Sequence, residues 1–172
     1  MSAFLDQLAG GDRRSIGNAD VVTRQVLTDP SKLVEIIAGL SAADPLVRMR
    51  CADVAEKVSA IHPEWLQPHK EVLIELAAHI TQQELRWHLA QMLPRLTLGA
   101  AERRVAVKVM FDYLNGPGKI VKTFAMQALA DFAQNDRALR GQLRRILVDS
   151  LQSGSPAMQA RARRLLAGLG GS

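Results

Sequence analysis

Apolar side chains recur along this chain with the spacing of an α-helix. The clearest stretch is residues 120–132, where the steps between successive apolar positions are 4, 1, 3 and 3. Its members are Val121, Ala125, Met126, Leu129 and Phe132. This spacing gathers them on one face of a helix, so we expect that face to be buried.

The same face occurs in three other stretches. Counted from Val47 to Leu85, to Val121 and to Ala157, the offsets are 38, 36 and 36 positions. The other members are Cys51, Ala52, Ala55 and Val58, then Leu89, Ala90, Leu93 and Leu96, then Ala162 and Leu165. A fixed period in the range of about 20 to 50 residues is typical of solenoids. The pattern therefore predicts an all-α solenoid.

Turn and capping signals divide the chain into successive helices. A short helix from Ser2 to Leu8, closed by Gly10 and Gly11, is followed by a basic loop over residues 12–18. Further helices are expected at 21–27, from 29–31 onward, at 45–61, 71–80, 83–96, 101–114, 120–132 and 137–151, and from Pro156. Residues 62–68 contain two prolines and are expected to form a turn. We interpret residues 1–172 as one domain, with a helix and loop at 1–19, a capping helical pair at 20–43 and repeats at 44–172.

Short motifs recur where the inner helices begin. They are Asp44, Pro45, Val47 and Arg48, then Leu85 and Arg86, then Val121 and Lys122, with small residues at Ala52, Ala90 and Ala125. In this respect residues 30–168 resemble HEAT (armadillo-type) repeats. The resemblance implies a right-handed α–α superhelix of about four helix pairs with an atypical N-terminal helical cap. It also implies that Arg48, Arg86 and Lys122 bond across the junctions between repeats. The last repeat departs from the pattern, with Met158 at the basic position.

Helical geometry indicates which side chains would line the concave face. Positions roughly opposite the buried stripe on each inner helix point away from the core. They are Met49, Asp53 and Lys57, then Trp87, Gln91 and Arg95, then Thr123, Gln127 and Asp131, then Gln159 and Arg163. Trp87 offers the large apolar body that interfaces favour, but packing against a neighbouring repeat explains it equally well. Trp65, in the expected turn, is interpreted as a structural plug.

Charge is concentrated at the C-terminal end. Residues 1–136 hold 15 Lys and Arg against 16 Asp and Glu, whereas residues 137–172 hold 7 against 1, giving −1 and +6. Most of these basic residues form a candidate basic patch: Arg137, Arg140, Arg144, Arg145, Arg161 and Arg164. Clustered arginine can neutralise phosphates, so nucleic-acid binding is the alternative function. A solvated helix face is the simpler explanation.

Enzyme and metal chemistry have little support in the sequence. The four histidines form no pair at ligand spacing, and neither a nucleophile elbow nor a phosphate loop is present. Trp87 and Asp131 are only superficially similar to the concave face of the HEAT-like alkylpurine DNA glycosylases. Cys51, the single cysteine, is expected to be a buried hydrophobe.

The expected function is therefore a non-enzymatic scaffold or adaptor. Its concave face would bind a protein or peptide, without cofactor or metal, and the sequence does not identify that partner. No run approaches the ~18 apolar residues of a membrane span, and the N-terminus lacks a basic leader pattern, so no membrane partner and a cytoplasmic location are expected.

Overall fold

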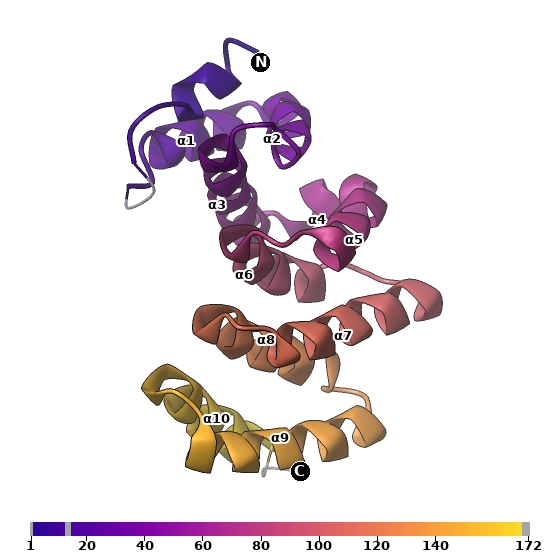
Figure 1. Cartoon of the computed structure of the whole chain (residues 1–172). Helices are drawn as coiled ribbons and strands as arrows, with labels where there is room; N and C mark the ends of the chain where they lie inside the picture. The colour runs from indigo at the N-terminus through magenta and orange to yellow at the C-terminus, as the bar shows by residue number, and fades with distance from the viewer. Residues whose placement is uncertain (1, 13–14, 170–172) are drawn as a thin grey trace. The chain divides into compact units, whose positions relative to one another are not determined.

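The computed structural model describes residues 2–12 and 15–169, and all regular secondary structure within these ranges is helical (Figure 1). The all-α prediction is therefore confirmed. Contacts divide the chain into two compact units, Met1–Thr97 and Leu98–Ser172, and each unit is described by itself. The expectation of a single domain stays a prediction. Within the described residues, no helix has the length and apolar character needed to cross a membrane.

The first unit is organised around its longest helix, α3 (Pro45–Ile61), which packs against α1, α2 and α6. Its other elements are η1 (Leu5–Leu8), α1 (Ala19–Thr28), η2 (Pro30–Lys32), α2 (Leu33–Gly39), α4 (Pro63–Leu66), η3 (Gln67–His69), α5 (Lys70–His79), α6 (Gln83–Met92) and η4 (Leu93–Arg95). The stripe expected to be buried is buried, with Val47, Cys51, Val58, Leu85 and Leu89 fully enclosed. The apolar spacing therefore identified the core faces of α3 and α6 correctly.

The beginning of α3 is fixed by side chains that its sequence motif contains. The Asp44 carboxylate accepts the backbone N–H of Leu46 at 2.8 Å, and Pro45 occupies the first helical position. Arg48 donates from Nη1 to the Ala42 carbonyl at 2.7 Å and from Nε to the Gln82 side chain at 2.9 Å. Because Gln82 precedes α6, Arg48 joins the starts of two packed helices.

Residues 62–68 differ from the expected turn. They form the short helix α4 and most of the 3-10 helix η3, because Pro63 and Pro68 both lie in first turns, where no N–H is needed. The His62 ring stacks on Trp65, with ring centres 4.0 Å apart and planes inclined by 6°. Trp65 is thus half-buried against this short helix.

The second unit contains α7 (Ala100–Asn115), α8 (Lys119–Phe132), α9 (Arg137–Ser153) and α10 (Pro156–Leu169). Helix α8 packs against the other three helices, and α9 packs against α10. Asp136 caps α9 by accepting the Leu139 N–H at 2.9 Å, as its position before the helix predicts. Residues 170–172, which follow α10, lie outside the described residues.

Candidate functional site

A cavity of about 300 Å³ lies in the first unit between α3, α6 and residues 15–16. Its lining is Ser15, Ile16, Met49, Arg50, Asp53, Glu84, Trp87 and His88. Three of the residues predicted for the concave face, Met49, Asp53 and Trp87, are therefore brought together here. Sequence reasoning missed the other five.

The two helical walls present their residues at helical spacing. Met49 and Asp53 are one turn apart on α3, while Glu84 lies one turn before Trp87 and His88 on α6. Trp87 is half-buried, and its ring centre lies 5.7 Å from that of His88 with the planes inclined by 53°. Direct packing of α3 on α6 holds these two walls together.

The third wall is held in place by the buried side chain of Arg50, which is only 2% exposed. Its Nη1 donates to the carbonyls of Leu8 at 2.8 Å and Gly10 at 2.6 Å. Its Nε and Nη2 donate to the Ser15 carbonyl at 3.3 and 3.2 Å. Charged hydrogen bonds of this kind are stronger than neutral ones, so Arg50 anchors the segment that leads to Ile16.

Glycines allow the N-terminal segment to follow this path. Gly10, Gly11 and Gly17 all have positive φ, at 74°, 80° and 53°, a region that other residues rarely enter. The expected loop over residues 12–18 thus wraps Arg50, although its residues 13–14 lie outside the described part of the chain. Two glycines before this loop and one within it are the sequence signal that could have indicated a close backbone approach.

Met49 is a correction to the sequence interpretation. It was expected to point to solvent, but it is only 8% exposed, because Ser15 and Ile16 close the same cavity. Helical periodicity places Met49 opposite the buried stripe of its own helix. Periodicity carries no information about a segment more than 30 positions earlier. That segment turns an expected open face into a partly enclosed one.

Ion pairs occupy one side of the cavity. Lys57 donates to Asp53 at 2.7 Å and to Asp20 of α1 at 2.6 Å. Burial lowers the pKa of Lys57, but its hydrogen bonds to the two carboxylates outweigh that effect and raise it. In the described residues, by contrast, no hydrogen bond or ion pair engages the carboxylate of Glu84.

His88 contributes a buried polar atom. The residue is 9% exposed, and its Nδ1 has no hydrogen-bond partner in the described structure. Burial lowers the pKa of the imidazole, against the opposing effect of Asp53, Glu56 and Glu84. The ring is therefore neutral at neutral pH, and one of its nitrogens can accept a hydrogen bond.

The remaining predicted residues of the first unit serve the fold. Gln91 donates to the Trp87 carbonyl of its own helix at 3.2 Å. Arg95 donates to the Ser59 hydroxyl at 2.7 Å and to the Glu56 carboxylate at 2.6 Å. Arg95 therefore joins η4 to α3 and is not available as a concave-face contact.

Within the second unit, Thr123 is a further correction. It is 8% exposed, and its hydroxyl donates to the Lys119 carbonyl at 2.9 Å, which satisfies the polar group inside the helix-packed interior. Gln127 donates to Asp131 at 2.9 Å and accepts from Arg161 Nη1 at 2.9 Å. Arg163 is exposed. Of the five residues predicted here, Gln127 and Asp131 form one bonded network, while Gln159 donates to the Gly154 carbonyl at 3.0 Å.

The candidate basic patch is smaller than predicted. Arg140 reaches back to the Ala133 carbonyl at 3.5 Å and to the Gln134 carbonyl, at the end of α8. Arg161 bonds Gln127 and lies over the Phe124 ring, with its guanidinium carbon 5.6 Å from the ring centre. Both are half-buried because they complete contacts between helices. The exposed members are Arg137, Arg144, Arg145 and Arg164.

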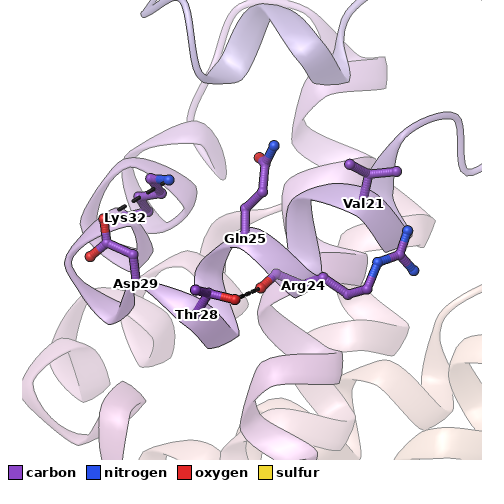
Figure 2. A pocket seen from close by; sticks show the side chains of 6 residues that line it. All are labelled: Val21, Arg24, Gln25, Thr28, Asp29 and Lys32. Carbon is purple, nitrogen blue, oxygen red and sulfur yellow. Dashed lines mark hydrogen bonds and ion pairs between the residues drawn. The ribbon is translucent and has the colours of Figure 1, made fainter.

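A second hollow of the first unit, of about 280 Å³, lies beside α1 and η2 (Figure 2). It is lined by Val21, Arg24, Gln25, Thr28, Asp29 and Lys32. Lys32 pairs with Asp29 at 3.9 Å, and Thr28 donates to the Arg24 carbonyl at 2.9 Å (Figure 2). Lys32 and Asp29 pair with each other, Gln25 donates to Gln7 outside the hollow, and the residues that line it include no aromatic side chain, unlike the Trp87 cavity.

The described residues contain no group of three or more His, Cys, Asp and Glu side chains that could hold a metal ion. The arrangement with the most varied recognition chemistry is therefore the Trp87 cavity, which combines an indole, an unengaged carboxylate and a neutral imidazole.

Comparison with protein-family models, with curated proteins and with solved structures finds no match for this chain.

Proposed function

We propose that this protein is a non-enzymatic, HEAT-like binding scaffold, and that the Trp87 cavity holds part of a protein or peptide partner. The observation that carries the proposal is the convergence of an aromatic ring and polar groups in one concave site. Binding sites are typically concave and largely apolar, with a few placed polar groups. Tryptophan supplies both a large contact area and an N–H donor, and it is enriched where interfaces derive most of their affinity.

The repeat assignment is supported by helix pairing and by a recurrent arginine contact. Consecutive helices pack as α5 with α6, α7 with α8, and α9 with α10. Arg48, Arg86 and Arg140 each lie in the first turn of a helix and donate to the carbonyl six positions earlier. Arg48 and Arg86 are two of the three residues for which the resemblance implies such a contact, whereas Arg140 lies in α9, which is not one of the expected inner helices.

The cavity walls favour a binding role because they are preorganised. Two packed helices and the Arg50 anchor hold the side chains before a partner arrives, so less conformational entropy is lost on binding.

We propose the cytoplasm as the location. A reducing compartment suits the free thiol of Cys51, which is buried and whose pKa burial raises to about 12.

The test is capture of partners from a lysate of the source cells on the immobilised intact protein. A partner recovered equally with and without nuclease treatment, and lost with Trp87→Ala, is the expected result. Loss should be at least tenfold, since truncation of an interface tryptophan costs about 2 kcal/mol or more.

The matched control is Trp65→Ala, because Trp65 belongs to the same unit but packs against His62 outside the cavity. This variant should retain the partner. Equal retention by Trp87→Ala would contradict the cavity as the binding site. A large fall in melting temperature for Trp87→Ala would show instead that Trp87 is a packing residue.

A second candidate function, nucleic-acid binding, is favoured by one observation in the second unit. Helices α9 and α10 pack together and expose Arg137, Arg144, Arg145, Arg163 and Arg164, and no ion pair engages these arginines in the described residues. A surface hollow of about 560 Å³ on α9 is lined by Gly141, Arg144, Arg145, Val148 and Asp149. Unpaired arginines on one surface are suited to phosphate contacts.

Retention on immobilised heparin and binding to a labelled single-stranded oligonucleotide test this second candidate. A plot of the logarithm of the binding constant against the logarithm of the salt concentration has a slope of about −0.7 for each phosphate contact with a single strand. Arg144→Glu/Arg145→Glu removes two such contacts, so this slope should become shallower by about 1.4. Glu71→Lys/Glu75→Lys on the exposed face of α5 is the control that raises net charge elsewhere. Absence of binding, or an unchanged salt slope, would exclude the basic patch as a nucleic-acid site.

A further inference from the structure

The charged side chains that line the Trp87 cavity are Arg50, Asp53 and Glu84, and the first two are engaged by other groups of the protein. The Asp53 carboxylate is bonded to Lys57, and the Arg50 guanidinium is bonded to backbone carbonyls. The carboxylate of Glu84 is engaged by no hydrogen bond or ion pair in the described residues. A ligand group that enters the cavity therefore meets one carboxylate that is free to accept hydrogen bonds.

The other side chains around Glu84 fit a cation carried on an apolar stem. Trp87, three positions along the same helix, offers the electron-rich indole, which attracts ammonium and guanidinium groups. Met49 and Ile16 supply apolar surface of the kind that the methylene groups of lysine and arginine cover. The volume of about 300 Å³ accommodates one long side chain rather than a folded element.

His88 provides an independent indication that a polar ligand group belongs in this cavity. It lines the site, it is nine-tenths buried, and its Nδ1 has no partner in the described structure. A buried polar atom without a hydrogen bond costs about 1 to 3 kcal/mol. Because Nδ1 is shielded from bulk water, a polar group of a bound ligand would be a partner that it lacks in the free protein.

We infer that the Trp87 cavity binds a lysine or arginine side chain of a peptide partner, with Glu84 as its counter-ion and Trp87 against its charged end. This inference rests on the proposed function, because it names the chemistry that the partner presents to the same site. It assigns specificity to Glu84, a residue outside the row that helical geometry predicted.

The experiment uses random heptapeptides displayed on phage, selected on the immobilised intact protein and counted by sequencing. Peptides that depend on the cavity are those that bind the wild-type protein but do not bind Trp87→Ala. We expect these peptides to share one lysine or arginine at a fixed position. Synthetic versions should lose at least tenfold in affinity when that residue is replaced by norleucine or, for arginine, by citrulline. Comparing the lysine and arginine versions of each peptide shows which cation the site prefers.

Glu84→Gln keeps the shape of the side chain and removes its charge, so it should weaken binding of the cationic peptides about tenfold or more. The melting temperature should fall only slightly, because the variant removes one carboxylate from the first turn of α6. Glu75→Gln, the same charge change on the exposed face of α5, should leave their affinity unchanged. Peptides that need Trp87 but carry no shared cation, or that bind Glu84→Gln equally well, would overturn this inference and leave the proposed function standing. If every selected peptide binds Trp87→Ala as well as it binds the wild type, this inference and the proposed function are both contradicted.

Discussion

A Cβ atom placed on Gly17 would lie 2.7 Å from the guanidinium carbon of Arg50, so these two residues leave no room for a side chain at position 17. The guanidinium cannot move aside cheaply, because backbone carbonyls hold it from several directions. The close approach of the N-terminal segment to α3 therefore depends on a glycine as much as on the arginine.

Gly17→Ala should destabilise the first unit through both collision and backbone strain. Position 17 has a φ of 53°, where an L-residue costs about 1 to 2 kcal/mol, and overpacking adds about 1 to 3 kcal/mol. Gly10→Ala is the matched control, since Gly10 also has a positive φ but no atom lies within 4 Å of a Cβ placed there. Urea unfolding should show a clearly larger loss for Gly17→Ala, and equal losses would contradict the collision.

Arg50→Met should loosen the third wall of the Trp87 cavity. The substitution keeps an apolar stem but removes the donors for the carbonyls of Leu8, Gly10 and Ser15, so we expect a loss of about 2 to 3 kcal/mol. Amide hydrogen exchange should quicken over residues 15–18. Arg24→Met, at an exposed position of α1, is the control and should change neither quantity. Unchanged exchange in Arg50→Met would show that the segment is held by other contacts.

Acid should weaken the first unit through His88. Burial lowers the pKa of His88 from 6.5 in the folded state, while Lys57 acts in the same direction and Asp53, Glu56 and Glu84 act against it. The unfolded chain then binds a proton more readily than the folded one. The stability due to neutral His88 is therefore present above pH 6.5 and is lost as the pH falls below it.

The measurement is the free energy of unfolding in urea from about pH 8 to about pH 5, for the wild type and for His88→Gln. The wild type loses stability as His88 takes up a proton, whereas glutamine does not titrate. The stability advantage of the wild type over His88→Gln should therefore narrow as the pH falls. Parallel curves over this range would contradict the assigned direction of the shift.

Two arginines of α10, two positions apart, should behave differently on truncation. Arg161→Ala removes a hydrogen bond to Gln127 and a contact with the Phe124 ring, so the second unit should lose about 1 to 2 kcal/mol. Arg163→Ala removes an exposed side chain, and its effect should stay within about 0.5 kcal/mol. Thermal unfolding of the two variants side by side checks this, and similar melting temperatures would show that the Arg161 contacts contribute little.

The helices and their buried faces could be predicted well from the sequence. The apolar spacing around Val47, Leu85 and Val121 identifies stripes that the structure buries, and the capping residues Asp44 and Asp136 lie where helices begin. The candidate site could be predicted only in part. Trp87 and Asp53 line it, but Met49 is enclosed and Arg95 is turned toward Glu56.

By itself, the sequence determined that this protein is helical and which face of α3, α6 and α8 is buried, although Ala157 of α10, placed on the buried face by the same pattern, is exposed. That information is local, because a period of 3.6 residues and a capping side chain act within one or two turns. Only the tertiary structure decided which polar groups remain free. Arg50 meets the Leu8 carbonyl 42 positions away, Arg95 meets Glu56 39 positions away, and Arg161 meets Gln127 34 positions away. Each pairing depends on which distant segments pack together, and those pairings leave Glu84 and His88 as the unengaged polar groups beside Trp87.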